Sequence, residues 1–593
     1  MNEPRCRRAL LAAGLCAVVL LLALPAGPET FVKPPAPAVS SRNMARGVHY
    51  VGSQACATCH ASIYKSFGQT GMGRSMAPGN DPSLADLPAP ATVFDRDLNQ
   101  YFEVLRKDGQ LYQSQYALDA AGKEVFRQTW KMEYSVGAGE NGIGFIVQRD
   151  RFLFEAPLSY YSQAHRWSFS PGYEIQNRGF TRPILAQCIT CHSGRPRPVA
   201  GQVGLYQDPP FEELAVGCEN CHGPGALHVA EHTAGKSAAT PSIVNPARLS
   251  GWLSDNICMR CHQGKDARVN PPGMQDLDFR PGMPLDPVVS VFKLPLDAHS
   301  ASGGALLEHY YGMTLSKCYR STAGGLHCIS CHDPHVEPSR EAAVDFYRSR
   351  CLTCHNQQSC TLSREKRMAT NPADNCIGCH MPKRTVATIT HGALTDHSIP
   401  AKDGEELTGN AGLIHLTAPF GQREDLSSVP PLVMMQVYDT LAREGHAEYR
   451  TPLDRLLDQL ARSHPADPLV LRALARRSAS ADSPAQREEG IRYMNQAMRV
   501  SPASVDDFIF MAELYIGQNH SREAVEWLEK ARASNPNLGE IYELLATQYM
   551  ALGDYRSALN VLRKGIELFP GDTKLTALAQ KARSATLDGM VGP

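Results

Sequence analysis

Residues 217–225 read Gly217-Cys-Glu-Asn-Cys-His-Gly-Pro-Gly225, and the pentapeptide Cys-x-x-Cys-His that they contain occurs seven times in the chain. Cysteine and histidine are scarce, so a chain of this length would contain roughly 0.02 such pentapeptides by chance. The seven copies use fourteen of the eighteen cysteines. We therefore expect residues 49–400, which carry all seven copies, to form one domain built around this motif.

The motif has the spacing of a covalent haem attachment site. Two cysteines three residues apart can each form a thioether with one haem vinyl group, and the histidine that follows can bind the iron as its proximal ligand. The sequence thus predicts seven covalently bound c-type haems. The predicted attachment cysteines are Cys56, Cys59, Cys188, Cys191, Cys218, Cys221, Cys258, Cys261, Cys328, Cys331, Cys351, Cys354, Cys376 and Cys379. The predicted proximal ligands are His60, His192, His222, His262, His332, His355 and His380.

Zinc binding and disulfide bonding are the other uses of paired cysteines. A zinc site takes its ligands in a tetrahedron, and an adjacent Cys-His pair is an awkward donor set for one ion. A disulfide framework gives no reason for a histidine after every pair. Both alternatives are therefore disfavoured against haem attachment.

A low-spin haem also needs a sixth iron ligand. We expect His228 and His335, which follow Gly or Pro turns just after a motif, and His391 and His397, which follow the last motif. Met72 is the candidate at the first haem, because no histidine stands close behind that motif. Weaker candidates are His49, His165, His299, His309 and His327.

Cys318 and Cys360 belong to no motif. In an oxidising compartment they would most simply pair with each other. An axial thiolate or a reactive thiol is the alternative for either residue.

The N-terminus predicts export. Three arginines within residues 5–8 precede an apolar run over residues 9–24, as in a signal peptide. We assign residues 1–28 to this signal, with an uncleaved membrane anchor as the alternative, and residues 29–48 to a flexible linker rich in Pro and Ala. The expected location is the periplasm or the outer face of the cytoplasmic membrane.

Residues 91–161 contain no motif and follow a strand pattern. Two alternating runs, 101–107 and 110–112, flank Asp108-Gly109, which is typical of a hairpin turn. We expect a small antiparallel sheet inserted between the first and second motifs.

The C-terminal region has a different period. Pro502, Pro536 and Pro570 recur at the 34-residue interval of a tetratricopeptide repeat. Small, aromatic and aliphatic residues occupy the packing positions between them, among them Ala512, Leu528, Tyr542, Ala546 and Leu562. After a linker over 401–430, we assign residues 431–593 to such repeats, which usually bind a protein or peptide. The formal net charge of −1 argues against nucleic acid as a partner.

The motif region resembles the multihaem cytochrome c family related to cytochrome c554, in the branch fused to tetratricopeptide repeats. The matching strings include Tyr50-Val-Gly-Ser-Gln-Ala-Cys-Ala-Thr-Cys-His60, the 217–225 segment with His228, Cys331-His-Asp-Pro-His335 and Thr395-Asp-His397. The resemblance implies closely packed haems with mostly His/His ligation. Where such proteins often have a histidine, this chain has Gly71-Met72.

These observations predict a mainly α fold: an irregular haem-packed cytochrome region, a small inserted antiparallel β-sheet and a C-terminal helical repeat solenoid. The expected function is electron transfer, with the repeats docking a redox partner protein. The alternative is an oxidoreductase that acts on a small nitrogen or sulfur compound at one five-coordinate haem.

Overall fold

The computed structural model describes residues 41–590 except 237, 264–265, 297–307, 357, 385–393, 403–404, 406–408 and 481–482. The predicted signal segment, most of the linker that follows it and the candidate ligand His391 lie outside the described residues. Among the residues that are described, no helix has both the length and the apolar character needed to span a bilayer.

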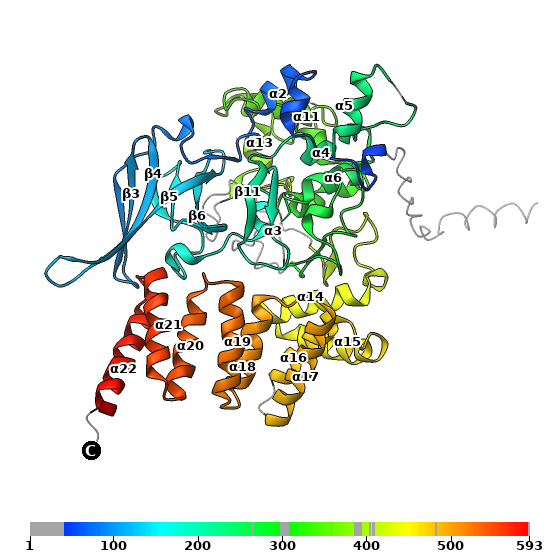
Figure 1. The fold of residues 1–593 in the computed structure, drawn as a ribbon. Coiled ribbons are helices and arrows are strands. Elements are labelled where there is room, and N and C mark those ends of the chain that lie inside the picture. The colour runs from blue at the N-terminus through cyan, green and yellow to red at the C-terminus, as the bar shows by residue number, and fades with distance from the viewer. Residues whose placement is uncertain are drawn as a thin grey trace, which may run out of the picture. The chain divides into compact units, whose positions relative to one another are not determined.

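The largest element of the N-terminal half is a nine-stranded antiparallel sheet with the order β2-β3-β4-β5-β6-β8-β9, in which β1 pairs with β5 and β7 with β6. Its two end strands approach each other, and the Trp167 indole of β9 donates a hydrogen bond of 2.7 Å to the Pro88 carbonyl, just before β2. The sheet therefore curls nearly closed (Figure 1). The strands are β1 (Met76–Pro78), β2 (Ala91–Asp95), β3 (Gln100–Lys107), β4 (Gln110–Leu118), β5 (Glu124–Val136), β6 (Gly142–Arg149), β7 (Phe152–Glu155), β8 (Leu158–Tyr161) and β9 (Arg166–Phe169).

The predicted hairpin is confirmed, but the predicted fold class is wrong. Strands β3 and β4 pair from Tyr101 to Lys107, and the turn residues Asp108 and Gly109 have φ values of 49° and 78°, as a two-residue hairpin turn requires. The sheet is not a small insertion, however, because β1 and β9 extend it beyond residues 91–161 and it has its own apolar core around Phe102, Phe145 and Leu158. An irregular, haem-packed helical region is not seen among the described residues.

The motif-bearing residues outside this sheet form short helices and small sheets. The strand pairs are β10 (Arg195–Pro198) with β11 (Tyr206–Glu213) and β14 (Lys383–Arg384) with β15 (Leu394–Thr395), and β12 (Ala267–Val269), β13 (Ser290–Lys293) and β16 (Ile414–His415) form a three-stranded sheet. The helices are α1 (Ser53–Ala57), α2 (Ala61–Phe67), α3 (Ala186–Ile189), α4 (Glu219–His222), α5 (Ala226–Thr233), α6 (Gly251–Met259), α8 (His309–Leu315), α9 (Lys317–Ser321), α10 (Cys328–Cys331), α11 (Ala343–Cys351), α12 (Arg364–Met368) and α13 (Cys376–His380).

The C-terminal region is an array of antiparallel helices (Figure 1). Within it, the predicted packing residues Ala512, Leu528, Tyr542, Ala546 and Leu562 are buried. The helices stack because each pair leaves an apolar stripe that only its neighbour covers. They are α14 (Pro431–Arg443), α15 (Arg450–Ser463), α16 (Pro468–Ala479), α17 (Pro484–Val500), α18 (Val505–Ile516), α19 (Ser521–Ser534), α20 (Gly539–Ala551), α21 (Tyr555–Leu568) and α22 (Thr573–Met590).

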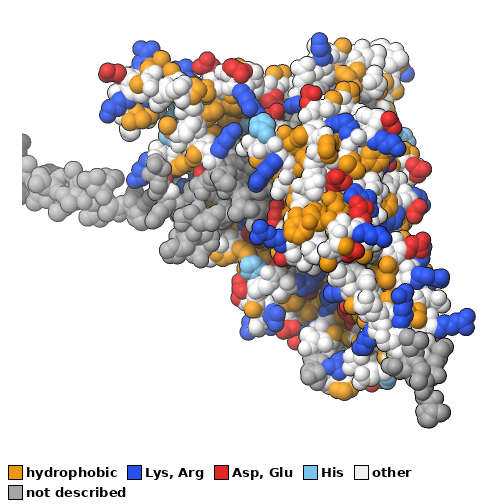
Figure 2. All heavy atoms as spheres, turned by 90° about the vertical axis from the view of Figure 1, so that its left-hand side faces the viewer, with side chains coloured by type: hydrophobic (Ala, Val, Ile, Leu, Met, Phe, Trp, Pro, Cys, Tyr) orange, Lys and Arg blue, Asp and Glu red, His pale blue; other side chains and the backbone are white. Residues whose placement is uncertain are grey.

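The loops between repeats contact the nine-stranded sheet. The buried Arg149 of β6 donates hydrogen bonds to the Asn537 side chain at 3.1 Å and to the Leu568 carbonyl at 3.3 Å. The Gln100 side chain of β3 donates to the Gly571 carbonyl at 2.8 Å. On the face in Figure 2, basic and acidic side chains are interspersed rather than segregated.

Candidate haem-attachment sites

Each motif lies in a single turn of helix or at the end of one. In five motifs the histidine N–H donates to the carbonyl of the first cysteine, over 2.8–3.1 Å, at positions His60, His222, His262, His332 and His355. This i to i+4 bond brings the first cysteine, the second cysteine and the histidine to one side of the turn. Two thiols and one imidazole on a common face fit the two vinyl groups and the iron of one haem.

Three of the motif histidines face a second imidazole at a common spacing. The ring centroids are 6.4 Å apart for His60 and His228, 6.0 Å for His222 and His335, and 6.3 Å for His332 and His397. A ligating nitrogen lies about 2 Å from its metal and about 1.1 Å from its own ring centre, so two imidazoles on opposite sides of one iron have centroids roughly 6.2 Å apart. The three pairs therefore have the separation of axial ligand pairs.

Three histidines of these pairs have a polar group near Nδ1. The Nδ1 atom of His222 lies 2.8 Å from the Val244 carbonyl, and that of His397 lies 2.9 Å from the Thr395 carbonyl. His335 turns its Nδ1 toward the Asp333 carboxylate at 3.5 Å. A partner at Nδ1 fixes the tautomer and leaves Nε2 available for a metal. Burial lowers the pKa of His222 and of His397, which favours the neutral form that a metal ligand requires.

A fourth pair involves a histidine that the sequence ranked low. His309, at the start of α8, lies 5.5 Å from His262 with the rings perpendicular, and 4.7 Å from His397. No local sequence signal identifies His309, because it is far along the chain from the motif that it faces. A buried ion pair between Glu308 and Lys293, at 3.2 Å, anchors the start of its helix.

The remaining candidate ligands are arranged differently. At the first motif, His60 faces His228 of α5. Met72 is half-buried. The backbone N–H of its neighbour Gly71 donates to the Glu337 carboxylate at 2.8 Å. His380 holds its Nδ1 2.7 Å from the Pro400 carbonyl. Within the described residues, neither His355 nor His380 has a ring contact to a second imidazole.

Thiols of different motifs lie next to each other. The Cys56 thiol of the first motif and the Cys218 thiol of the third are hydrogen-bonded, which lowers the pKa of Cys218 to about 6 and raises that of Cys56. The Cys191 thiol of the second motif and the Cys261 thiol of the fourth are also hydrogen-bonded, which raises the pKa of Cys191 and lowers that of Cys261. Cys328 of the fifth motif is hydrogen-bonded to Cys258 of the fourth, which, with burial, raises the pKa of Cys328. The first motif therefore neighbours the third, and the fourth neighbours the second and the fifth.

Buried carboxylates hold these motifs together. Glu219 is 3% exposed and accepts hydrogen bonds from the backbone N–H groups of Val51, Gly52 and Gly225, which ties the first motif to the third. Asp255 of α6 accepts from the Cys328 N–H at 2.9 Å and so joins the fourth motif to the fifth. Both carboxylates lie within or beside a motif. From the sequence alone, neither can be distinguished from a surface residue.

Of the cysteines outside the motifs, Cys318 and Cys360 lie in the described part of the chain, and both are free thiols there. Burial raises the pKa of Cys318, and the nearby Cys354 of the sixth motif raises it further. Cys318 thus lies near a motif and is not bonded to Cys360.

Comparisons with known proteins match two segments. A family model described as cytochrome c554 and c-prime matches residues 170–223, and a tetratricopeptide repeat model matches residues 539–572. The C-type polyheme cytochrome OmcC of Geobacter sulfurreducens is 24% identical over 254 residues, which cover 36% of this chain and 32% of OmcC. The chain thus spans about a third of the length of this curated relative.

Among solved structures, the crystal structure of the MamA protein matches with a TM-score of 0.23 and 15% identity, over 26% of this chain and 82% of MamA. The Sgt2 tetratricopeptide repeat domain from Aspergillus fumigatus matches with a TM-score of 0.19 and 19% identity, over 21% of this chain and 82% of that domain. The family matches confirm the predicted resemblance: the chain resembles cytochrome c554-like multihaem c-type cytochromes and carries a tetratricopeptide repeat region at its C-terminal end.

Proposed function

We propose that the protein is an exported heptahaem c-type cytochrome that conducts electrons between protein partners. The observation that carries this proposal is the set of three imidazole pairs with ring centroids 6.0–6.4 Å apart. When bound, each haem supplies a one-electron iron couple. Two imidazoles per iron keep the coordination the same in both oxidation states, so little has to move when an electron arrives.

The ring distances support four proposed ligand pairs. We assign His60 with His228, His222 with His335, His262 with His309 and His332 with His397. Met72 stays as the alternative to His228 at the first haem, and His391 as a proposed ligand for a centre whose sixth position these pairs do not fill. The thiol contacts Cys56 to Cys218, Cys191 to Cys261 and Cys258 to Cys328 support close spacing of the haems at these motifs. The fourth motif, which neighbours three others, is the expected branch point.

The repeats are proposed as the docking site for a redox partner. Repeats of this class present exposed helix faces to proteins. The loops at 534–537 and 568–571 contact the motif-bearing half, so a partner would use the helix faces that those loops leave open. The predicted signal over residues 1–28 and the likeness to a polyhaem cytochrome support an extracytoplasmic location.

Electron paramagnetic resonance of the oxidised, haem-loaded protein tests the conduit. We expect mainly low-spin signals because each proposed pair supplies two strong ligands. A high-spin signal equivalent to one haem, abolished by cyanide, nitrite, sulfite or hydroxylamine, would contradict a pure conduit. That result would favour instead an oxidoreductase acting on a small nitrogen or sulfur compound.

A further inference from the structure

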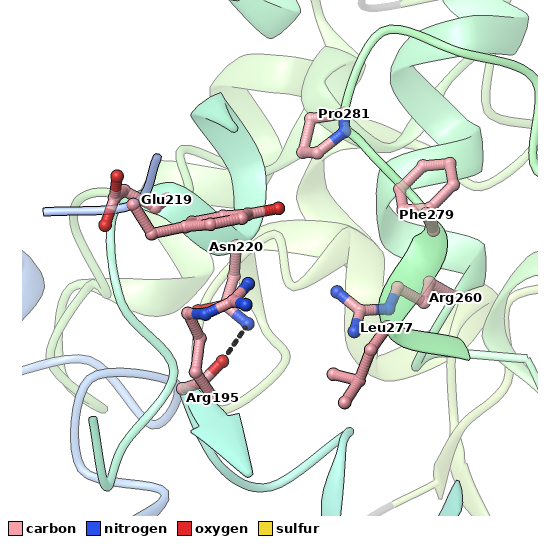
Figure 3. A pocket seen from close by; sticks show the side chains of 9 residues that line it. Arg195, Glu219, Asn220, Arg260, Leu277, Phe279 and Pro281 are labelled. Carbon is pink, nitrogen blue, oxygen red and sulfur yellow. Dashed lines mark hydrogen bonds between the residues drawn. The ribbon is translucent and has the colours of Figure 1, made fainter. Parts of the chain in front are cut away.

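A pocket separate from the imidazole pairs lies where the second, third and fourth motifs meet (Figure 3). It is small and partly open to solvent. Arg195, just after the second motif, and Arg260, inside the fourth, line it together with Glu219 of the third. The proposed haems at these motifs would surround this pocket.

Two guanidinium groups converge in the pocket. In Figure 3 the side chains of Arg195 and Arg260 extend toward each other from opposite walls. Arg260 is only 7% exposed, and its Nε atom has no hydrogen-bond partner among the described residues. Arg195 pairs its Nε with Glu212 at 2.9 Å and lies 3.5 Å from the centroid of the Tyr50 ring, which leaves its two Nη groups toward the pocket.

Among the described residues, no ion pair neutralises Arg260. Glu219 turns its carboxylate away, toward the backbone N–H groups of Val51, Gly52 and Gly225. The Phe279 ring, 5.9 Å from the Arg260 guanidinium, offers a cation–π contact but no negative charge. An arginine cannot lose its proton, and a buried unpaired charge is costly, so an anion between the two arginines would remove that cost.

We propose that this pocket binds a carboxylate-type oxyanion between Arg195 and Arg260. The planar guanidinium presents paired N–H donors that match the two oxygens of such a group. The anion can come from either of two sources: the propionate of a haem attached at the second, third or fourth motif, or a small free oxyanion. The first source rests on the haem attachment proposed above.

The test uses the haem-loaded, full-length protein and its Arg260→Gln, Arg260→Lys and Arg195→Gln variants. Arg127→Gln, in the exposed ion pairs of the nine-stranded sheet, is the matched control. Potentiometric titration with inorganic phosphate absent and then present is the readout. Intact mass and absorbance verify that each variant keeps its haems and its fold.

If the anion is a propionate, both glutamine variants shift one haem to a more negative potential, because a nearby cation favours the reduced state. Arg260→Lys keeps the positive charge and so retains most of the wild-type potential, and phosphate changes no potential. If the anion is free, phosphate shifts one potential of the wild type, and the glutamine variants need at least tenfold more phosphate for the same shift. Wild-type potentials in all variants, with no phosphate effect, would overturn the proposal. A missing haem would instead count against the proposed function.

Discussion

The imidazole of His335 is the most informative single side chain, because it faces His222 at 6.0 Å with its Nδ1 already engaged. We expect His335→Ala to convert one low-spin haem to a high-spin, five-coordinate centre and to leave the other haems unchanged. His335→Met should restore a six-coordinate centre with a higher potential, since a thioether ligand raises the potential of a haem relative to histidine. Electron paramagnetic resonance and potentiometry measure both effects.

The control for this prediction is His464→Ala, because His464 lies in the repeat region and its imidazole contacts only the Ser463 hydroxyl among the side-chain hydrogen bonds described. It should change no haem signal. A His335→Ala protein with an unaltered low-spin spectrum would exclude His335 as an iron ligand.

The sequence identifies the motifs by their spacing, but it suggests only in part which imidazoles lie opposite each other. His228 and His335 stand a few residues after a motif, so local spacing suggested them. His309 faces His262 only because the chain returns through α8, and that return depends on contacts such as Lys293 with Glu308. Long-range pairing of this kind leaves no periodic trace in the sequence.

At the scale of the elements, strand patterns predicted the β3–β4 hairpin but not the size of the sheet. The hairpin has regular alternation and a two-residue turn, which local rules identify. Strand β1 has three residues and pairs with β5, far along the chain, and β9 has four. Segments this short carry too little alternation to be separated from loops. The 34-residue period of the repeats, in contrast, extends over several elements and predicted their packing residues correctly.

A buried ion pair links two neighbouring repeats. Arg472 of α16 donates to the Asp507 carboxylate of α18 at 2.8 Å, with side-chain exposures of 15% and 7%. Burial alone would raise the pKa of Asp507, but hydrogen bonds from Arg472 and Ser504 outweigh it and hold the pKa below its usual value. We expect Arg472→Gln to lower the free energy of unfolding by about 3 kcal/mol at neutral pH, because it leaves a buried carboxylate unpaired.

The pH dependence of this effect follows from the direction of the shift. A carboxylate with a lowered pKa in the folded state stabilises the protein above the unfolded value of about 3.9, and this contribution is lost as the pH falls through the lowered value. Denaturant unfolding at pH 7 and pH 3 should therefore show a larger difference between variant and wild type at pH 7. An equal difference at both pH values would contradict this assignment.

At the scale of the whole molecule, the repeats and the sheet are joined through Arg149. Burial lowers the pKa of Arg149, and its guanidinium lies 4.7 Å from the Trp130 ring centroid and 5.6 Å from that of Phe569. We expect Arg149→Met to keep most of the packing but lose the hydrogen bonds to Asn537 and Leu568, at a cost of about 2 kcal/mol. Thermal unfolding followed by circular dichroism measures this loss, and Arg477→Met on the exposed side of α16 is the control.

Coupling between the two halves gives this variant a second signature. If Arg149 joins them, the variant should begin to unfold in two steps, with the repeats separating first. If the melting curve of the variant matches that of the wild type, other contacts hold the sheet and the repeats together.

The most direct test of the account is the mass of the denatured protein after expression with its export signal in a host that matures c-type cytochromes. Seven intact motifs, each offering two thiols and one imidazole from a single turn, predict seven covalently retained haems. Replacement of Cys218 and Cys221 by serine should remove one haem and leave six. Fewer than seven haems on the wild-type chain, or a chain with no covalent haem, would contradict the central claim.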